Sequence, residues 1–89
     1  MNKQFLGALA VTTALSPVAA IAQTEVQFWH AFTGRLGELV KAQVEEFNAS
    51  QDEFVVVESH TGTYSETLNA GIAAFRAGAQ PHILMVFDV

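Results

Sequence analysis

The sequence predicts an α/β fold in which parallel strands alternate with helices. Two observations lead to this prediction. Three short runs are rich in β-branched and aromatic residues, and two stretches with the 3.6-residue period of an amphipathic helix separate them. The order is therefore βαβαβ, with no internal repeat and no low-complexity linker. Because helical crossovers between parallel strands are right-handed, this order predicts half of a doubly wound sheet.

The first strand is expected at residues 25–29, which include Val26 and Trp29. Such β-branched and aromatic side chains favour a pleated surface. A helix is expected next, at residues 35–47, where apolar residues recur on one side and charged residues occupy the other. Residues 48–52 are rich in turn formers, so we expect the helix to end there.

The second half of the pattern repeats this alternation. Three consecutive valines within residues 54–58 predict a strand that is covered on both faces, as in parallel sheets. The second helix is expected to start at Thr63, which forms the capping-box pattern S/T-x-x-E with Glu66. Gly78 is typical of a helix end, and residues 82–87 form an apolar run that predicts the third strand.

Residues 1–22 are predicted to be a cleaved secretory signal peptide. A short polar start with one lysine precedes a long apolar run, which closes on small residues at Ala20 and Ala22, the −3 and −1 positions of a cleavage site. An uncleaved membrane anchor is the alternative, since the run approaches the ~20 residues of a spanning helix. Pro17 disfavours such a helix. We therefore expect residues 23–89 to be the exported part, truncated from a longer protein.

Charge and composition argue against several classes of function. Four Lys+Arg against nine Asp+Glu give a formal net charge of −5, so no basic surface is expected to bind nucleic acid. The chain contains no cysteine, which excludes disulfides and cysteine-based zinc sites. Its three histidines lack metal-ligand spacing, and phosphate-binding loops and nucleophile elbows are missing. We expect no metal, no cofactor and no catalytic residue.

A ligand is expected beyond the carboxyl ends of the strands, where polar and aromatic residues gather. Tyr64 stands at the first position of the second helix, where free amides and the helix dipole favour an anion. Asp88 follows the third strand and can accept hydrogen bonds from hydroxyls, but would repel a phosphate. The pair suggests a ligand with one anionic and one hydroxylated end. The residues alone favour a different reading, in which Tyr64 is a surface tyrosine and Asp88 a helix cap.

Several motifs resemble the periplasmic glycerol-3-phosphate-binding proteins, which capture substrate for ABC importers. The motifs are Phe28-Trp29-His30, the stretch A-G-I-A-A-F-R-x-G at residues 70–78, and the run at residues 81–89. The resemblance implies a two-lobed protein that closes on its ligand. Residues 23–89 would then form the opening βαβαβ unit of one solute-binding lobe.

The resemblance also implies two ligand contacts and a function. Tyr64 matches a ligand-binding tyrosine of the family, and Asp88 matches an acidic residue that is usually the longer Glu. The expected function is capture of sn-glycerol 3-phosphate, or a glycerophosphodiester, in the periplasm for a permease and ATPase complex in the inner membrane. The expected protein is not an enzyme. The alternatives are a neutral-sugar-binding protein of the same architecture and the start of a secreted α/β enzyme.

Overall fold

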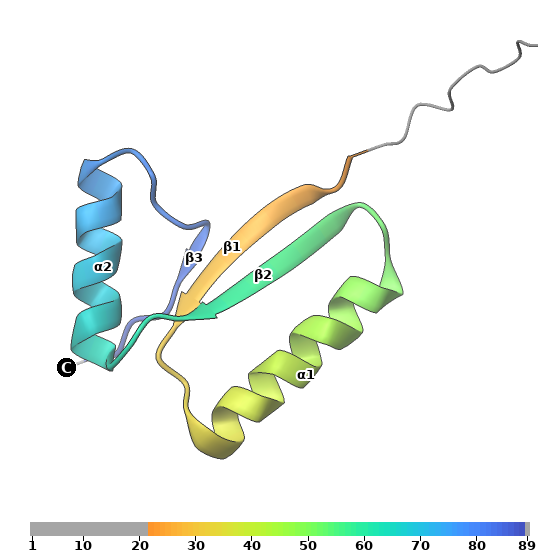
Figure 1. Cartoon of the computed structure of the whole chain (residues 1–89), viewed down its shortest axis with the longest axis horizontal. Helices are drawn as coiled ribbons and strands as arrows, with labels where there is room; N and C mark the ends of the chain where they lie inside the picture. Colours follow the sequence, from red (N-terminus) through yellow and green to blue (C-terminus); the bar gives the residue numbers. More distant parts are fainter. Residues whose placement is uncertain (1–21, 89) are drawn as a thin grey trace, which may run out of the picture.

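The computed structural model describes residues 22–88, so residues 1–21 of the predicted signal peptide lie outside the described part (Figure 1). The elements follow the predicted βαβαβ order, which confirms the α/β class. They are β1 (Thr24–His30), α1 (Gly34–Ser50), β2 (Phe54–His60), α2 (Tyr64–Arg76) and β3 (Ile83–Leu84). Neither of the helices in this part of the chain is long and apolar enough to cross a membrane.

The three strands form one parallel sheet in the order β2-β1-β3, with β1 in the centre. β1 pairs with β2 along its whole length, from Thr24 opposite Phe54 to His30 opposite His60. α1 packs on β2, whereas α2 packs on β1 and β3 (Figure 1). The two crossovers run in opposite directions across the sheet, so their common right-handedness places the helices on opposite faces.

The first helix ends within the predicted stretch of residues 48–52, because α1 runs through Ser50 and Gln51 is its C-cap. Asn48 does not break the helix, since its side chain bonds the outer edge of β2. Its Oδ1 accepts from the Val56 amide at 2.8 Å, and its Nδ2 donates to the Val56 carbonyl at 2.9 Å. Gln51 organises the turn instead, with Oε1 accepting from the Phe54 amide at 2.7 Å.

The third strand is shorter than the predicted residues 82–87. Only Ile83–Leu84 pair with β1 as a strand, with Leu84 opposite Trp29. The Met85 amide then donates to the Trp29 carbonyl at 2.9 Å. Because β1 ends one residue later, β3 has no partner along which to continue. The segment after β3 runs back towards the start of α2 (Figure 1).

The predicted start of the second helix is confirmed. The Thr63 hydroxyl accepts from the Glu66 amide at 3.1 Å, and the Glu66 carboxylate accepts from the Thr63 amide at 2.8 Å. α2 ends at Arg76, shortly before Gly78 adopts the positive φ of 72°. Gly71 is buried against the Leu84 side chain, so α2 lies close to β3.

Burial is slight over residues 22–88, where Ala31 is the only buried hydrophobic side chain. The predicted cover on both faces of the second strand is not found here, because Val55, Val56 and Val57 are half-buried and α1 is the one described helix that contacts β2. Many large apolar side chains are exposed. These are Leu36, Leu39, Phe47, Phe54, Tyr64, Ile72, Phe75, Ile83, Val86 and Phe87.

Candidate ligand-binding site

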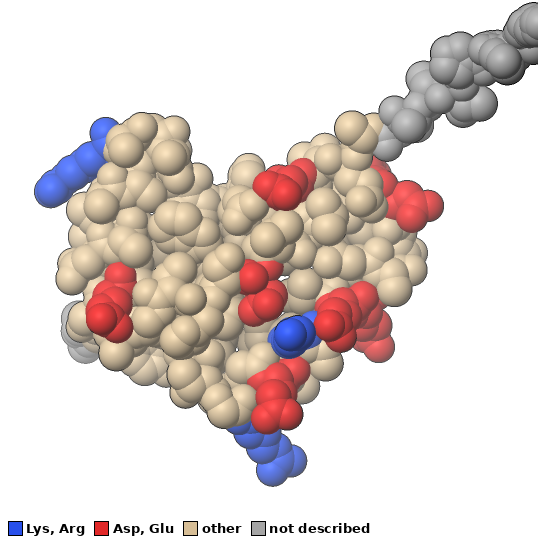
Figure 2. Space-filling model, in the orientation of Figure 1, with Lys and Arg blue, Asp and Glu red and all other residues tan. Residues whose placement is uncertain are grey.

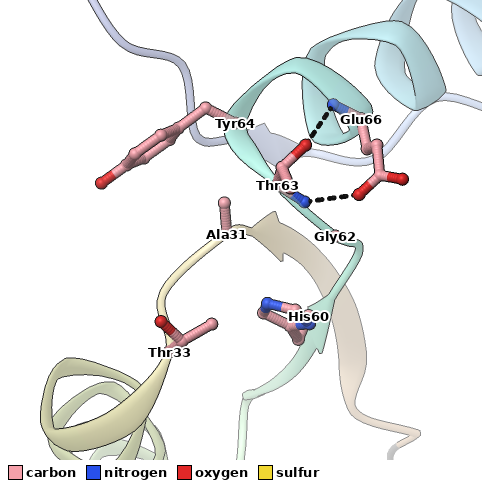
Figure 3. A pocket seen from close by; sticks show the side chains of 7 residues that line it. All are labelled: Ala31, Thr33, His60, Gly62, Thr63, Tyr64 and Glu66. Carbon is pink, nitrogen blue, oxygen red and sulfur yellow. Dashed lines mark hydrogen bonds between the residues drawn. The ribbon is translucent and has the colours of Figure 1, made fainter.

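A hollow of about 380 Å³ lies at the carboxyl ends of β1 and β2 (Figure 3). Two loops form it, one leading from β1 to α1 and the other from β2 to α2. This is the edge of the sheet at which a ligand was expected. The lining residues are Ala31, Thr33, His60, Gly62, Thr63, Tyr64 and Glu66.

Tyr64, the first predicted ligand contact, lies in the wall of this hollow. It is the first residue of α2, and its side chain is 48% exposed. Its ring contacts that of Phe87, with the two centroids 5.4 Å apart. This contact packs the Tyr64 ring against the segment that follows β3.

Asp88, the second predicted contact, does not line the hollow. It lies beyond β3, which ends at Leu84, so its predicted place at the end of the third strand is wrong. The contact between Phe87 and Tyr64 nevertheless brings the segment that carries Asp88 to the start of α2. Asp88 is exposed there. A ligand contact by either residue stays a prediction.

The capping box sets the electrostatics on the α2 side of the hollow. Hydrogen bonds from the backbone and then the side chain of Thr63 lower the pKa of Glu66, and the nearby His60 lowers it further. Glu66 is therefore ionised at neutral pH, and its charge opposes an anion beside it. The start of α1 differs, because Thr33 makes no side-chain capping bond and the first turn contains no acidic residue. The partial positive charge at the start of α1 is thus less neutralised by nearby side chains than the one at the start of α2.

His30 is a buried polar residue at this edge that the sequence did not single out as part of a site. It ends β1 and is 2% exposed. Its Nε2 lies 2.7 Å from Glu58 Oε1, and its Nδ1 accepts from the Phe32 amide at 3.2 Å. Its place at the end of a strand, next to the expected ligand edge, was the available signal. Within residues 22–88 no group of three potential metal ligands is present.

No basic patch is visible among the described residues on the face shown in Figure 2. Figure 2 shows acidic side chains scattered over the visible face, with few basic ones between them. The formal net charge of the whole chain is −5. Capture of an anion by this segment would therefore depend on local hydrogen-bond donors rather than on a broad positive field.

No protein-family model matches the chain. Curated relatives do match it, and the three described next are all named sn-glycerol-3-phosphate-binding periplasmic protein UgpB. That of Brucella abortus is 50% identical over 82 residues, which cover 92% of this chain and 18% of the relative. That of Agrobacterium fabrum is 51% identical over 83 residues, covering 90% and 19%. That of Rhizobium meliloti is 54% identical over 69 residues, covering 78% and 16%.

The chain thus spans less than a fifth of the length of these relatives. Within that span the identity is about one residue in two, and the match extends over most of the described strands and helices. Over nearly its whole length, the chain is therefore homologous to the sn-glycerol-3-phosphate-binding periplasmic proteins.

Proposed function

We propose that this chain is the opening segment of a periplasmic binding protein that captures sn-glycerol 3-phosphate for an ABC importer. The observation that carries the proposal is the 50% identity, over 92% of the chain, to a protein named for that ligand and compartment. The hollow at the strand ends supports it, because open α/β sheets bind ligands there. The complete protein would pass its ligand, chemically unchanged, to a permease and ATPase complex in the inner membrane.

Two residues of this segment would contact the ligand. Tyr64 would donate its hydroxyl to the phosphate, and Asp88 would accept from the glycerol hydroxyls. Figure 3 shows the Tyr64 ring and the Glu66 carboxylate leaving the start of α2 in opposite directions. A phosphate at the Tyr64 hydroxyl would therefore lie away from the ionised Glu66. The remaining contacts would come from parts of the protein outside this chain.

Calorimetric titration of the complete protein is the decisive experiment. We expect heat of binding with sn-glycerol 3-phosphate and none with glycerol or with a neutral disaccharide. A glycerophosphodiester tests whether the site admits a substituted phosphate. Binding of the disaccharide without binding of glycerol 3-phosphate would instead establish the neutral-sugar alternative.

Export is a separate part of the proposal. Residues 1–22 would direct the chain to the periplasm and be removed, so the mature protein would begin at Gln23. The intact mass of the protein from a periplasmic fraction measures this directly. A membrane-bound product that retains residues 1–22 would show that the segment is an anchor.

A further inference from the structure

Both loops that line the hollow are hydrogen-bonded to one buried residue, His30. Its ring accepts from the Phe32 amide at 3.2 Å, and its backbone carbonyl accepts from the Thr61 amide at 2.9 Å. Phe32 lies between two lining residues of the first loop, whereas Thr61 directly precedes two lining residues of the second. The Thr61 hydroxyl also donates to that of Thr67, a fully buried residue of α2. His30 thus connects the β1–α1 loop with the start of α2.

The hydrogen-bond partners of His30 select one state of its ring. The backbone amide of Phe32 can only donate, so Nδ1 must carry a lone pair. Glu58 Oε1 lies 2.7 Å from Nε2, and a carboxylate oxygen accepts, so Nε2 must carry the hydrogen. These two bonds are satisfied together by the neutral ring protonated at Nε2. A second proton on Nδ1 would make this nitrogen a donor. It would then face the Phe32 amide, which is also a donor, and the hydrogen bond between them would break.

We propose that His30 is a positioning residue for the ligand hollow. Its neutral, Nε2-protonated ring holds the loop of residues 31–33 in place against the start of α2, and a second proton releases this loop. Binding of glycerol 3-phosphate should therefore weaken in acid through His30. The link to that ligand rests on the proposed function, whereas the link between His30 and the loop does not.

Other titratable groups also face His30 or the hollow, and their effects on binding must be distinguished from the effect of His30. Glu58 and His60 of β2 are the ones nearest, with the ring of His60 centred 6.0 Å from that of His30. Glu66 of α2 lies across the hollow from the loop of residues 31–33 and interacts with His60. The other rings that contact His30, those of Phe28 and Phe32, carry no charge. His60 is therefore the second imidazole at this edge, and its effect has to be distinguished from that of His30.

Two variants of the complete protein test the roles of the two ring nitrogens separately. The amide oxygen of Asn can occupy the place of Nδ1, whereas the amide nitrogen of Gln reaches the place of Nε2. His30→Asn should keep the acceptor for Phe32 and bind glycerol 3-phosphate nearly as the parent does. His30→Gln should keep the donor to Glu58 and lose about tenfold in affinity, as expected for one buried hydrogen bond. Equal affinity of the two variants would overturn the proposal.

The pH profile supplies a readout that a purely structural role would not change. Titrations between about pH 8 and pH 5, where imidazoles change charge, should show affinity falling in the parent but falling less in His30→Asn. The phosphate of the ligand also titrates near pH 6, but it does so equally for both proteins. The same pair is compared in a His60→Asn background, which removes the neighbouring imidazole. A profile that His30→Asn leaves unchanged would contradict the acid-dependent release.

Two measurements test His30 without any ligand, so failure of the proposed function can be told apart from failure of this inference. The nitrogen chemical shifts of the His30 ring in the unmodified protein should be those of the Nε2-protonated tautomer. Hydrogen exchange of the Phe32 amide should be slow in the parent and in His30→Asn, and fast in His30→Gln. A ring protonated at Nδ1 would overturn the proposal even if glycerol 3-phosphate binds. So would a Phe32 amide that exchanges at the same rate in the parent and in both variants.

Discussion

At the scale of single residues, polar side chains form hydrogen bonds with backbone groups that have no backbone partner at the ends and edges of strands and helices. Asn48 bonds both backbone groups of Val56 on the outer edge of β2, at 2.8 and 2.9 Å. Gln51 bonds the Phe54 amide in the turn before that strand, and His30 does the same for Phe32 after β1. Unpaired backbone groups are costly once water is excluded, so these side chains stabilise the loops they close.

Tyr64→Phe should weaken binding of glycerol 3-phosphate by about 1.5 to 3 kcal/mol, the usual value of a hydrogen bond to a charged group. The substitution removes the hydroxyl but keeps the ring that contacts Phe87, so the unfolding temperature should not change. Calorimetric titration of the complete protein measures the affinity. A variant that binds like the parent would show that the Tyr64 hydroxyl does not contact the ligand.

Asp88→Asn should weaken binding, because it exchanges an acceptor for a donor against the glycerol hydroxyls. Asp88→Glu should bind as tightly as the parent or more tightly. Asp88 is exposed and lies outside the wall of the hollow, so an added methylene extends its reach without meeting a packed neighbour. The same titrations compare the two variants. Unchanged affinity in Asp88→Asn would exclude Asp88 from the site.

At the scale of elements, the start of α2 depends on the charge of Glu66. Hydrogen bonds from the backbone and side chain of Thr63 lower the pKa of this carboxyl. A carboxyl with a lowered pKa in the folded state stabilises that state above its unfolded pKa. This contribution is lost as the pH falls through the lower, folded value. Acid should therefore loosen the first turn of α2.

The pH dependence of α2 can be followed by NMR. The Glu66 carboxyl shift and the Thr63 amide shift should titrate together, with a midpoint below 4.5, the ordinary value for Glu. Glu66→Gln provides the control, since its Thr63 amide should show no transition in that range. A Glu66 midpoint at or above 4.5 would mean that the capping box does not form in solution.

The approach of α2 to β3 depends on Gly71. A Cβ at this position would overlap the side chain of Leu84, although alanine favours a helix by about 1 kcal/mol over glycine. Overpacking of this kind typically costs about 1 to 3 kcal/mol, so Gly71→Ala should destabilise the protein by about 1 kcal/mol net. Urea unfolding of the complete protein measures the change.

A second substitution shows whether this overlap is the cause. Adding Leu84→Val to Gly71→Ala shortens the facing side chain and should recover part of the loss. Gly78→Ala is the comparison, because its positive φ of 72° strains alanine in open space. Its cost should be independent of the residue at position 84. A Gly71→Ala variant more stable than the parent would show that the helix propensity outweighs the contact.

At the scale of the whole molecule, the segment leaves much apolar surface in water. Phe75 is 68% exposed on α2, Leu36 is 56% exposed on α1, and Val86 is 59% exposed after β3. The sheet edges outside β2 and β3 also carry no further strand among residues 22–88. Exposed apolar patches and open edges promote association with other chains.

We therefore predict that residues 23–89 do not fold stably when expressed alone. Burial of apolar surface drives folding, and in this segment too little of it is removed from water to offset the loss of chain entropy. Calorimetry should show no cooperative transition, and the sample should associate at high concentration. The complete protein is the control. A cooperative transition from a soluble monomer of the segment would contradict the prediction.

Much of the fold could be predicted from local sequence. The order of elements, the parallel sheet and the capping box at Thr63 were all confirmed. The predicted extents were less accurate. α1 still includes Asn48, the first of the turn formers at residues 48–52, and β3 is far shorter than its apolar run. In both cases a distant strand decides the outcome. Val56 of β2 gives the Asn48 side chain hydrogen-bond partners while Asn48 stays helical, and β1 ends before residues 86–87 could pair with it.

The sequence by itself determined what depends on neighbours within one or two turns: helical periodicity, the capping box, the order of elements and hence the edge where a site would lie. Only the tertiary structure decided what depends on residues far apart in the chain. It placed Tyr64 in the hollow and against Phe87, left Asp88 outside, and made His30 a link between two loops. The reason is physical, because such contacts exist only once the sheet brings the strand ends together.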